Sequence, residues 1–191
     1  TFEAKSLLFL PSKAPFDMHY RDMGRRGIQL YVKRVFIMDE CKELLPDYLR
    51  FVKGVVDAED LSLNVSREIL QKDRQIKAIR KHLVKKILDA IKSLAQDDRE
   101  SFAGFWGEFG TALKEGLLDH GTDREKILDF ILCHSTHDDQ KTTSLTEYVE
   151  RMGEDQDKLY VLTAPSLDAA RNSPHLEAFT DKGIEVLLLT D

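Results

Sequence analysis

One stretch of the sequence, residues 60–71 (D-L-S-L-N-V-S-R-E-I-L-Q), has the residue types for phosphate chemistry. Arg67 is always charged and carries a planar fork of donors, which suits it to stabilise negative charge on a transferring phosphoryl group. Asn64 and Gln71 add polar tips, and aliphatic residues between them can anchor the segment. The ordinary alternative is that Arg67 pairs with a carboxylate such as Glu68. Taken alone, the residues leave both readings open.

A second cluster, Cys133, His134, His137 and Asp138, offers sulfur, nitrogen and oxygen atoms that could bind a metal ion. Its H-x-x-H spacing has no downstream partner group, and the segment follows a predicted helix end, so we expect a solvated loop and no metal site. The chain also lacks a G-x-S-x-G elbow, a P-loop and an H-E-x-x-H motif. No complete active site is visible in it.

The composition indicates the class of protein and its cellular compartment. The chain has 191 residues and two cysteines without a CxxC motif, so neither a disulfide framework nor a cysteine-based zinc site is indicated, and a reducing, cytoplasmic setting fits best. No run of about 18 apolar residues predicts a membrane span. Because the first residue is not Met and strands lie close to both ends, we expect a piece of a longer protein.

Charge is distributed unevenly. Residues 67–96 carry 9 basic and 3 acidic side chains, a net +6, whereas residues 97–191 carry 9 basic and 21 acidic ones, a net −12. A basic segment beside an arginine-bearing loop could attract nucleic acid or nucleotide phosphates, or it could be a solvated helix face. A basic nucleic-acid-binding module or a pure scaffold is therefore the alternative to a role in phosphate chemistry.

The elements that would position Arg67 begin with strands. Residues 5–10 and 51–57 read as strands, and residues 28–38 as one long strand whose alternation shifts after Lys33 and Arg34, by a bulge or because both faces are buried. Residues 39–50 read as a short helical segment interrupted at Pro46. The loop between the first two strands carries large apolar side chains that could form a contact surface or fold back over the core: Phe16, Met18, Tyr20 and Met23.

Helices follow. A helix of about six turns starts near Lys72, and a second, residues 98–115, has glycines at 104, 107 and 110 that predict close approach of a neighbouring helix. A third starts at a capping box, Thr122 to Glu125, and is predicted to bury Ile127, Leu128, Ile131 and Leu132.

The last third of the chain reads as a small α/β unit. Its expected elements are a helix capped by Ser144 and Glu147, a strand at 159–164, helices at 166–172 and 174–182, and a buried parallel strand at 184–190.

Long motifs in order across the chain carry a resemblance. They are L-Y-V-K-R-V-F-I-M-D-E, the stretch from P-D-Y-L-R-F-V-K-G to N-V-S-R-E-I-L-Q, then S-L-T-E-Y-V-E-R-M and G-I-E-V-L-L-L-T-D. They closely resemble the middle domain of the ninety-kilodalton heat-shock chaperone family, most like its bacterial branch, the high-temperature protein G group.

The resemblance implies an α/β (α+β) fold of two α-β-α sandwich units joined by a three-helix coil, with segments 1–72, 73–133 and 134–191. It implies an ATP-dependent chaperone in which Arg67, with Asn64 and Gln71, acts on ATP held with Mg²⁺ by an amino-terminal domain outside this chain. Phe16, Met18 and Tyr20 would contact non-native client proteins. A homodimer would form through an absent carboxyl-terminal domain, co-chaperones would be further partners, and this piece alone would be inactive.

Overall fold

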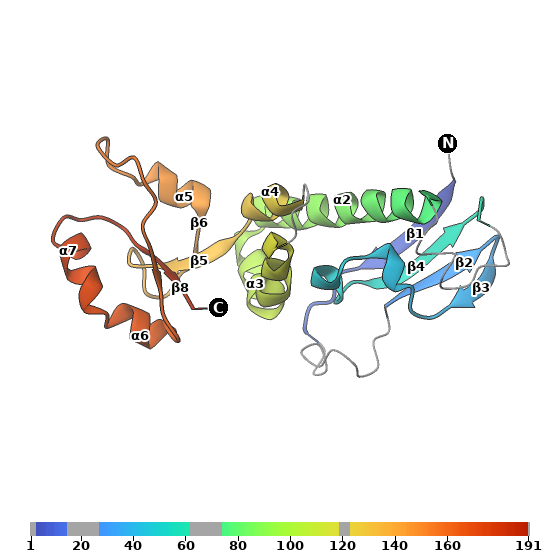
Figure 1. Cartoon of the computed structure of the whole chain (residues 1–191), viewed down its shortest axis with the longest axis horizontal. Coiled ribbons are helices and arrows are strands. Elements are labelled where there is room, and N and C mark those ends of the chain that lie inside the picture. The colour runs from blue at the N-terminus through green and yellow to red at the C-terminus, as the bar shows by residue number, and fades with distance from the viewer. Residues whose placement is uncertain (1–2, 15–26, 62–73, 119–122, 191) are drawn as a thin grey trace. The chain divides into compact units, whose positions relative to one another are not determined.

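The computed structural model describes residues 3–14, 27–61, 74–118 and 123–190. Contacts divide the chain into two compact units, Thr1–Arg124 and Glu125–Asp191. Each unit has its own four-stranded sheet and its own helices (Figure 1), so the predicted two-sheeted α/β fold is confirmed. The division into segments 1–72, 73–133 and 134–191 stays a prediction.

The first sheet has the order β1-β4-β2-β3. Its strands are β1 (Ala4–Phe9), β2 (Ile28–Val32), β3 (Val35–Met38) and β4 (Lys53–Ala58). Strand β4 pairs antiparallel with β1 and parallel with β2, and β2 pairs antiparallel with β3. The β4 strand is thus central, and it leads toward the segment that contains Arg67.

The prediction of one long strand over residues 28–38 is wrong. Lys33 and Arg34 have φ values of 52° and 65°, which make a two-residue turn and fold the stretch into the β2–β3 hairpin. The backbone N–H of Arg34 donates a hydrogen bond of 3.1 Å to Asp57 Oδ1 on β4, which supports the turn. Such turns usually carry Asn or Gly, so Lys-Arg gave no turn signal in the sequence. The shift in alternation marks this turn.

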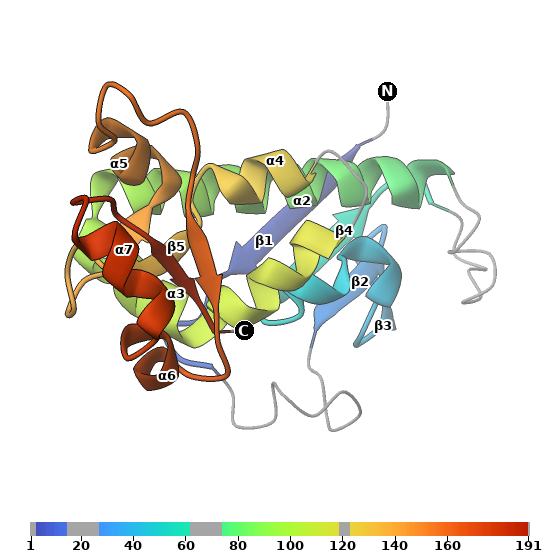
Figure 2. The ribbon, with the colours of Figure 1, turned by 60° about the vertical axis from the view of Figure 1, so that its left-hand side comes forward.

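Between β3 and β4 lie two single-turn helices, η1 (Lys42–Leu44) and η2 (Asp47–Leu49), separated at Pro46 as the sequence predicts. The long helix α2 (Arg74–Asp97) lies beside the first sheet in Figures 1 and 2. Its buried side chains recur every three or four residues, as the apolar spacing predicts: Ile76, Ile79, Leu83, Val84, Ile87, Leu88 and Ile91.

Helix α3 (Arg99–Lys114) is capped by Asp98, whose side chain accepts a hydrogen bond from the Ser101 N–H. Its aromatic side chains are buried together with Phe51: Phe102, Phe105, Trp106 and Phe109. The predicted close approach at the glycines of this helix is wrong. A Cβ on Gly104 or Gly107 would meet nothing within 4 Å, and a Cβ on Gly110 would lie 2.9 Å from the Trp106 indole of the same helix. Gly110 therefore makes room for Trp106.

After η3 (Glu115–Leu118), helix α4 (Asp123–Leu128) is shorter than predicted. It buries Ile127, whereas Leu132 lies in a strand, β5 (Leu132–Ser135), and Ile131 precedes that strand. The apolar run 127–132 thus serves a helix and then a strand, and periodicity over so short a run does not separate the two. The C-H-S segment predicted as a loop is part of β5.

The second sheet has the order β6-β5-β8-β7, from β6 (Thr143–Ser144), β7 (Val161–Thr163) and β8 (Leu187–Leu189) with β5. Strand β8 is parallel to β7, as predicted, but antiparallel to β5. The helices are α5 (Leu145–Glu150), α6 (Leu167–Arg171), η4 (Pro174–Leu176) and α7 (Glu177–Thr180). Ser144 and Glu147 form the predicted capping box of α5. A hydrophobic core cluster of this unit consists of four buried residues: Ala170, Leu176, Val186 and Leu188.

Candidate functional site

The predicted site residues all fall outside the described ranges. Asn64, Arg67 and Gln71 belong to residues 62–73, and Phe16, Met18 and Tyr20 to residues 15–26. The structure does describe the residues that flank both segments. These flanking residues show how each predicted site segment is attached to the first unit.

The segment with Arg67 is anchored where it leaves β4. The Glu59 N–H donates to Glu3 O at 3.0 Å, and the Glu3 N–H donates to Asp60 Oδ2 at 2.7 Å, which ties the strand end to β1. Leu61 follows and is only 3% exposed. A further ion pair, between Lys5 Nζ and Glu59 Oε1 at 3.0 Å, is solvent-exposed and therefore contributes little to stability. The hydrogen bonds and the buried leucine therefore fix this end.

The other end of the segment is anchored by α2. The helix begins at Arg74, and its first buried side chain, Ile76, is 1% exposed. Arg67 lies six residues after Leu61 and seven before Arg74, near the middle of the segment. Described residues on both sides of the segment are therefore buried in the core of the first unit.

Helix α2 presents positive charge to solvent from its first turn. Its exposed side chains include a series of cations: Arg74, Lys77, Lys81, Lys85 and Lys86. Lys85 Nζ lies 3.9 Å from Asp89 Oδ2, an exposed ion pair that offsets the charge of Lys85 alone among these five. This positive potential favours a negatively charged ligand close to the Arg67 segment.

The segment with Phe16 is also anchored at its two ends. The Ala14 N–H donates to Glu108 Oε2 on α3 at 2.8 Å. On the other side, the Cys41 N–H donates to Ile28 O at 3.0 Å, which holds the first residue of β2. The predicted client-contacting side chains thus belong to a segment attached to a folded core at both ends.

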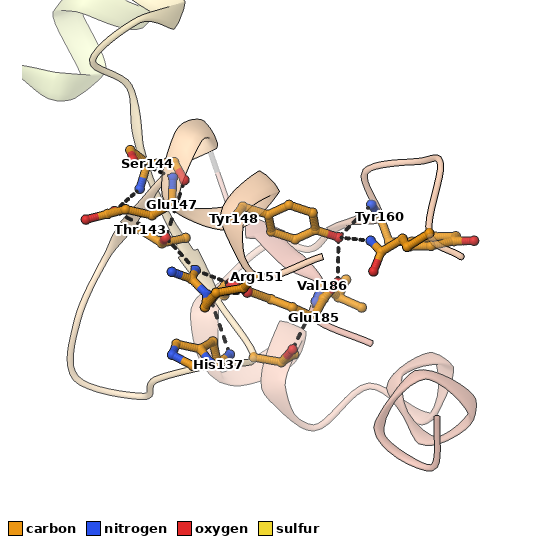
Figure 3. Close-up of polar contacts among 12 residues, drawn as sticks. His137, Thr143, Ser144, Glu147, Tyr148, Arg151, Tyr160, Glu185 and Val186 are labelled. Carbon is orange, nitrogen blue, oxygen red and sulfur yellow. Dashed lines mark hydrogen bonds and ion pairs between the residues drawn. The ribbon is translucent and has the colours of Figure 1, made fainter. Parts of the chain in front are cut away.

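A polar network in the second unit, shown in Figure 3, was not foreseen from the sequence. Arg151 Nε and one terminal nitrogen donate to the two carboxylate oxygens of Glu185, each at 2.8 Å. The same terminal nitrogen donates to Thr143 Oγ1 at 2.7 Å. Burial alone would raise the pKa of Glu185, but hydrogen bonds from Arg151 and Ser135 outweigh it and lower that pKa.

Tyr148 is the second centre of this network. Its side chain is 1% exposed, and its hydroxyl donates to Glu185 O at 2.7 Å. The hydroxyl also accepts from Gln156 Nε2 and from the Tyr160 N–H. The contacts join α5 to the residues before β7 and β8. Tyr148 lies in α5 and Arg151 is its C-cap residue, and their spacing of three is a signal that they share a face. Because both side chains are hydrogen-bonded to residues of the second unit, we interpret the network as one that stabilises the fold of this unit.

The two cysteines have the character of core residues. Both are free thiols with buried side chains. Burial, and then the nearby Glu43 carboxylate, raise the pKa of Cys41 to about 12, so its thiol is unreactive at neutral pH. Across the described ranges, no three His, Cys, Asp or Glu side chains gather as a metal site would require.

Comparison with known proteins identifies the family. The whole chain, residues 1–191, matches the family described as Hsp90 protein. The chain belongs to the Hsp90 family. It is 60% identical over 192 residues to the chaperone protein HtpG of Nocardia farcinica, and 58% identical over 191 residues to that of Frankia casuarinae. Each alignment covers 100% of this chain and 29% of the relative.

A solved structure supports the same assignment. The middle domain of a heat shock protein of Plasmodium falciparum superimposes with a TM-score of 0.86 at 30% identity, over 100% of this chain and 73% of that one. The chain thus has the fold of an Hsp90 middle domain and spans less than a third of its HtpG relatives. Among the described helices of this Hsp90 chain, none has the length and apolar character needed to cross a bilayer.

Proposed function

We propose that this chain is the middle segment of an ATP-dependent Hsp90 chaperone and that it supplies Arg67 to the hydrolysis of ATP held by another domain. Gln71 and Asn64 would orient the arginine within its segment. The observation that supports this most is the anchoring of residues 62–73 at Leu61 and at Ile76, next to the cationic surface of α2. The planar, permanently charged guanidinium of an arginine suits it to stabilise charge that develops on a transferring phosphoryl group.

The remaining parts of the proposal follow from family membership. ATP and its Mg²⁺ ion would bind to the amino-terminal domain, so this chain alone would turn over no ATP. Non-native client proteins would contact Phe16, Met18 and Tyr20. The protein would form homodimers through its carboxyl-terminal domain, receive co-chaperones and work in the cytoplasm, where two buried free thiols are stable.

The test is the Arg67→Ala variant of the full-length protein. Loss of one preorganised electrostatic stabiliser lowers turnover by about 10²-fold or more. ATP affinity of the isolated amino-terminal domain stays the same because that domain is unchanged. The control is Lys182→Ala, which removes an exposed cation from the second unit, outside both the segment and α2. Normal turnover in the Arg67 variant would contradict the catalytic role and favour a pure scaffold.

A second measurement uses the chain as it stands. Mixing it with the isolated amino-terminal ATPase domain is expected to raise the ATPase rate of that domain, and the Arg67→Ala chain is expected not to. Equal stimulation by the two chains would mean that the middle segment acts without its arginine.

A further inference from the structure

The solvent side of α2 carries a regular row of cations over its first three turns. Four exposed side chains follow one another at intervals of three, four and four residues: Arg74, Lys77, Lys81 and Lys85. At 3.6 residues per turn, these side chains leave the helix within about 80° of one another. With a rise of 1.5 Å per residue, the row is about 16 Å long. We call these four residues the basic stripe.

The basic stripe lies at the end of the helix where cations are least favourable. An α-helix has a partial positive charge at its amino end, so acidic side chains stabilise the first turn and basic ones destabilise it. The first turn of α2 has no acidic residue, and its last turn has no basic one. Arg74 and Lys77 occupy the first turn, and Asp97 ends the helix. The charge order along α2 is thus the reverse of the order that stabilises a helix.

Neighbours within the basic stripe also repel one another. Lys81 lies four residues from both Lys77 and Lys85, a spacing at which like charges destabilise a helix. Within the described ranges, the one ion pair of the stripe joins Lys85 Nζ to Asp89 Oδ2 at 3.9 Å, with side chains 64% and 54% exposed, so it contributes little. The stripe therefore lowers the stability of α2, and its described contacts offset little of this loss.

The form of the basic stripe favours an acidic helix over nucleic acid as its ligand. Carboxylates four residues apart on a partner helix repeat about every 6 Å along its axis, as the cations of the stripe do. Proteins that bind single-stranded nucleic acid add aromatic rings on which bases stack, and α2 has no Phe, Tyr or Trp. A long polyanion would also meet the net charge of −6 of the chain, whereas a short acidic segment meets the stripe alone.

We propose that the basic stripe is a docking surface for an acidic helical segment of another protein, one with carboxylates at intervals of three or four residues on one face. Bound carboxylates would neutralise the repulsion along the stripe and its conflict with the helix dipole, so the stability that α2 lacks when free is recovered in the complex. The inference does not depend on the role of Arg67, which lies outside the stripe.

The probe is an alanine-based peptide of about 20 residues, a length that supports helix formation in water, with glutamate at every fourth position. A second peptide has the same composition, with its glutamates spread around the helix. Fluorescence anisotropy at low salt measures the binding of each labelled peptide to this chain. We expect tighter binding of the first peptide, and a loss of that binding as the salt concentration rises.

The decisive variant is Lys77→Glu combined with Lys81→Glu, which reverses two charges of the basic stripe. We expect it to weaken binding of the first peptide by about tenfold or more. The matched control, Lys158→Glu combined with Lys182→Glu, makes the same change in net charge at exposed residues of the second unit. Its affinity should stay within about twofold of the wild type. Lys81→Gln removes one charge of the stripe and keeps the inference testable if the double variant folds poorly.

Thermal unfolding separates a docking role from a structural one. Because the stripe opposes the helix dipole, the stripe variant should melt at the same temperature as the wild type or at a higher one, and a lower melting temperature would make these cations structural. Equal binding of the two peptides, or equal weakening by the control variant, would overturn the inference. Stripe-dependent binding of duplex DNA of about 20 base pairs without peptide binding would overturn it in favour of nucleic acid. Salt-sensitive self-association that the stripe variant abolishes would assign the surface to a second copy.

Discussion

Replacing Glu185 by Gln should lower the free energy of unfolding of the second unit, and the exposure of the two side chains sets the expected range. The substitution keeps the shape of the side chain but removes the charge that binds Arg151 through two hydrogen bonds of 2.8 Å. The Glu185 side chain is 12% exposed and that of Arg151 is 29% exposed. The pair lies between an exposed pair, worth about 0.2–1 kcal/mol, and a buried one, whose disruption costs about 3–5 kcal/mol. We expect a loss of about 1.5–3 kcal/mol in the free energy of unfolding of this unit.

The effect should depend on pH in a defined direction. The pKa of Glu185 is lowered in the folded protein from its ordinary value of 4.5. A carboxyl group of this kind contributes stability that is complete above its unfolded pKa and is lost as the pH falls through the folded one. The wild type therefore loses this contribution in acid, while the Gln variant has none to lose. The difference between them should shrink below the ordinary pKa of a glutamic acid.

Amide hydrogen exchange is the suitable assay, because the single tryptophan, Trp106, belongs to the first unit and does not report on this one. The Thr136 N–H donates to Val186 O, and the Val186 N–H donates to Thr136 Oγ1. At about pH 7 their exchange should accelerate about 10- to 150-fold, since each 1.4 kcal/mol is a factor of ten.

The matched control for this measurement is Glu154→Gln, which removes a charge from an exposed side chain of the same unit. Its exchange rates should stay close to those of the wild type. Equal exchange in the wild type and Glu185→Gln at about pH 7 would refute the reasoning, as would a difference of the same size at about pH 4.

Two further predictions concern the first unit. Gly104→Ala should raise its free energy of unfolding by about 0.5–1 kcal/mol, because the new Cβ meets no neighbour. Gly110→Ala should lower that free energy, because the new Cβ would lie 2.9 Å from the buried Trp106 ring. Denaturation followed by Trp106 fluorescence measures both changes, and a shift of both variants in the same direction would contradict the packing. Phe16→Ala combined with Met18→Ala should weaken binding of a non-native client protein while the cooperative thermal transition persists; loss of that transition would place the two side chains in the core.

The sequence predicted best where long-range packing follows a local period. Helix α2, 24 residues long, has buried side chains at a helical spacing from Ile76 to Ile91, and the types and spacing of Ser144 and Glu147 predict the cap of α5. It predicted worst where a turn had unusual chemistry. The Lys33-Arg34 turn depends on left-handed backbone angles and on the Asp57 carboxylate of another strand, a contact that no local pattern contains. The apolar run 127–132 was predicted wrongly for another reason, because so short a run fits a helix and a strand equally well.

Site prediction shows the same limit in a different form. Arg67 stood out because of its residue type and its neighbours, and the family resemblance then gave it a role that local spacing had left open. Glu185 did not stand out, since its partner Arg151 is 34 residues away and an isolated glutamate before an apolar strand has no distinctive pattern. Side chains that support a fold through distant partners are therefore found only once the chain is folded.

On the proposed function, Arg67 acts on a nucleotide that another domain holds. An electrostatic stabiliser acts only if its position is set before the charge develops, so its segment must be held by the protein rather than by the ligand. On either side of the Arg67 segment, Leu61 and Ile76 are buried, and the Asp60 carboxylate accepts a hydrogen bond of 2.7 Å from the Glu3 N–H. The same β4 strand is fixed at its other end by Phe51 and Arg50. Both the start and the end of β4 are thus joined by hydrogen bonds of neighbouring residues to other parts of the first unit.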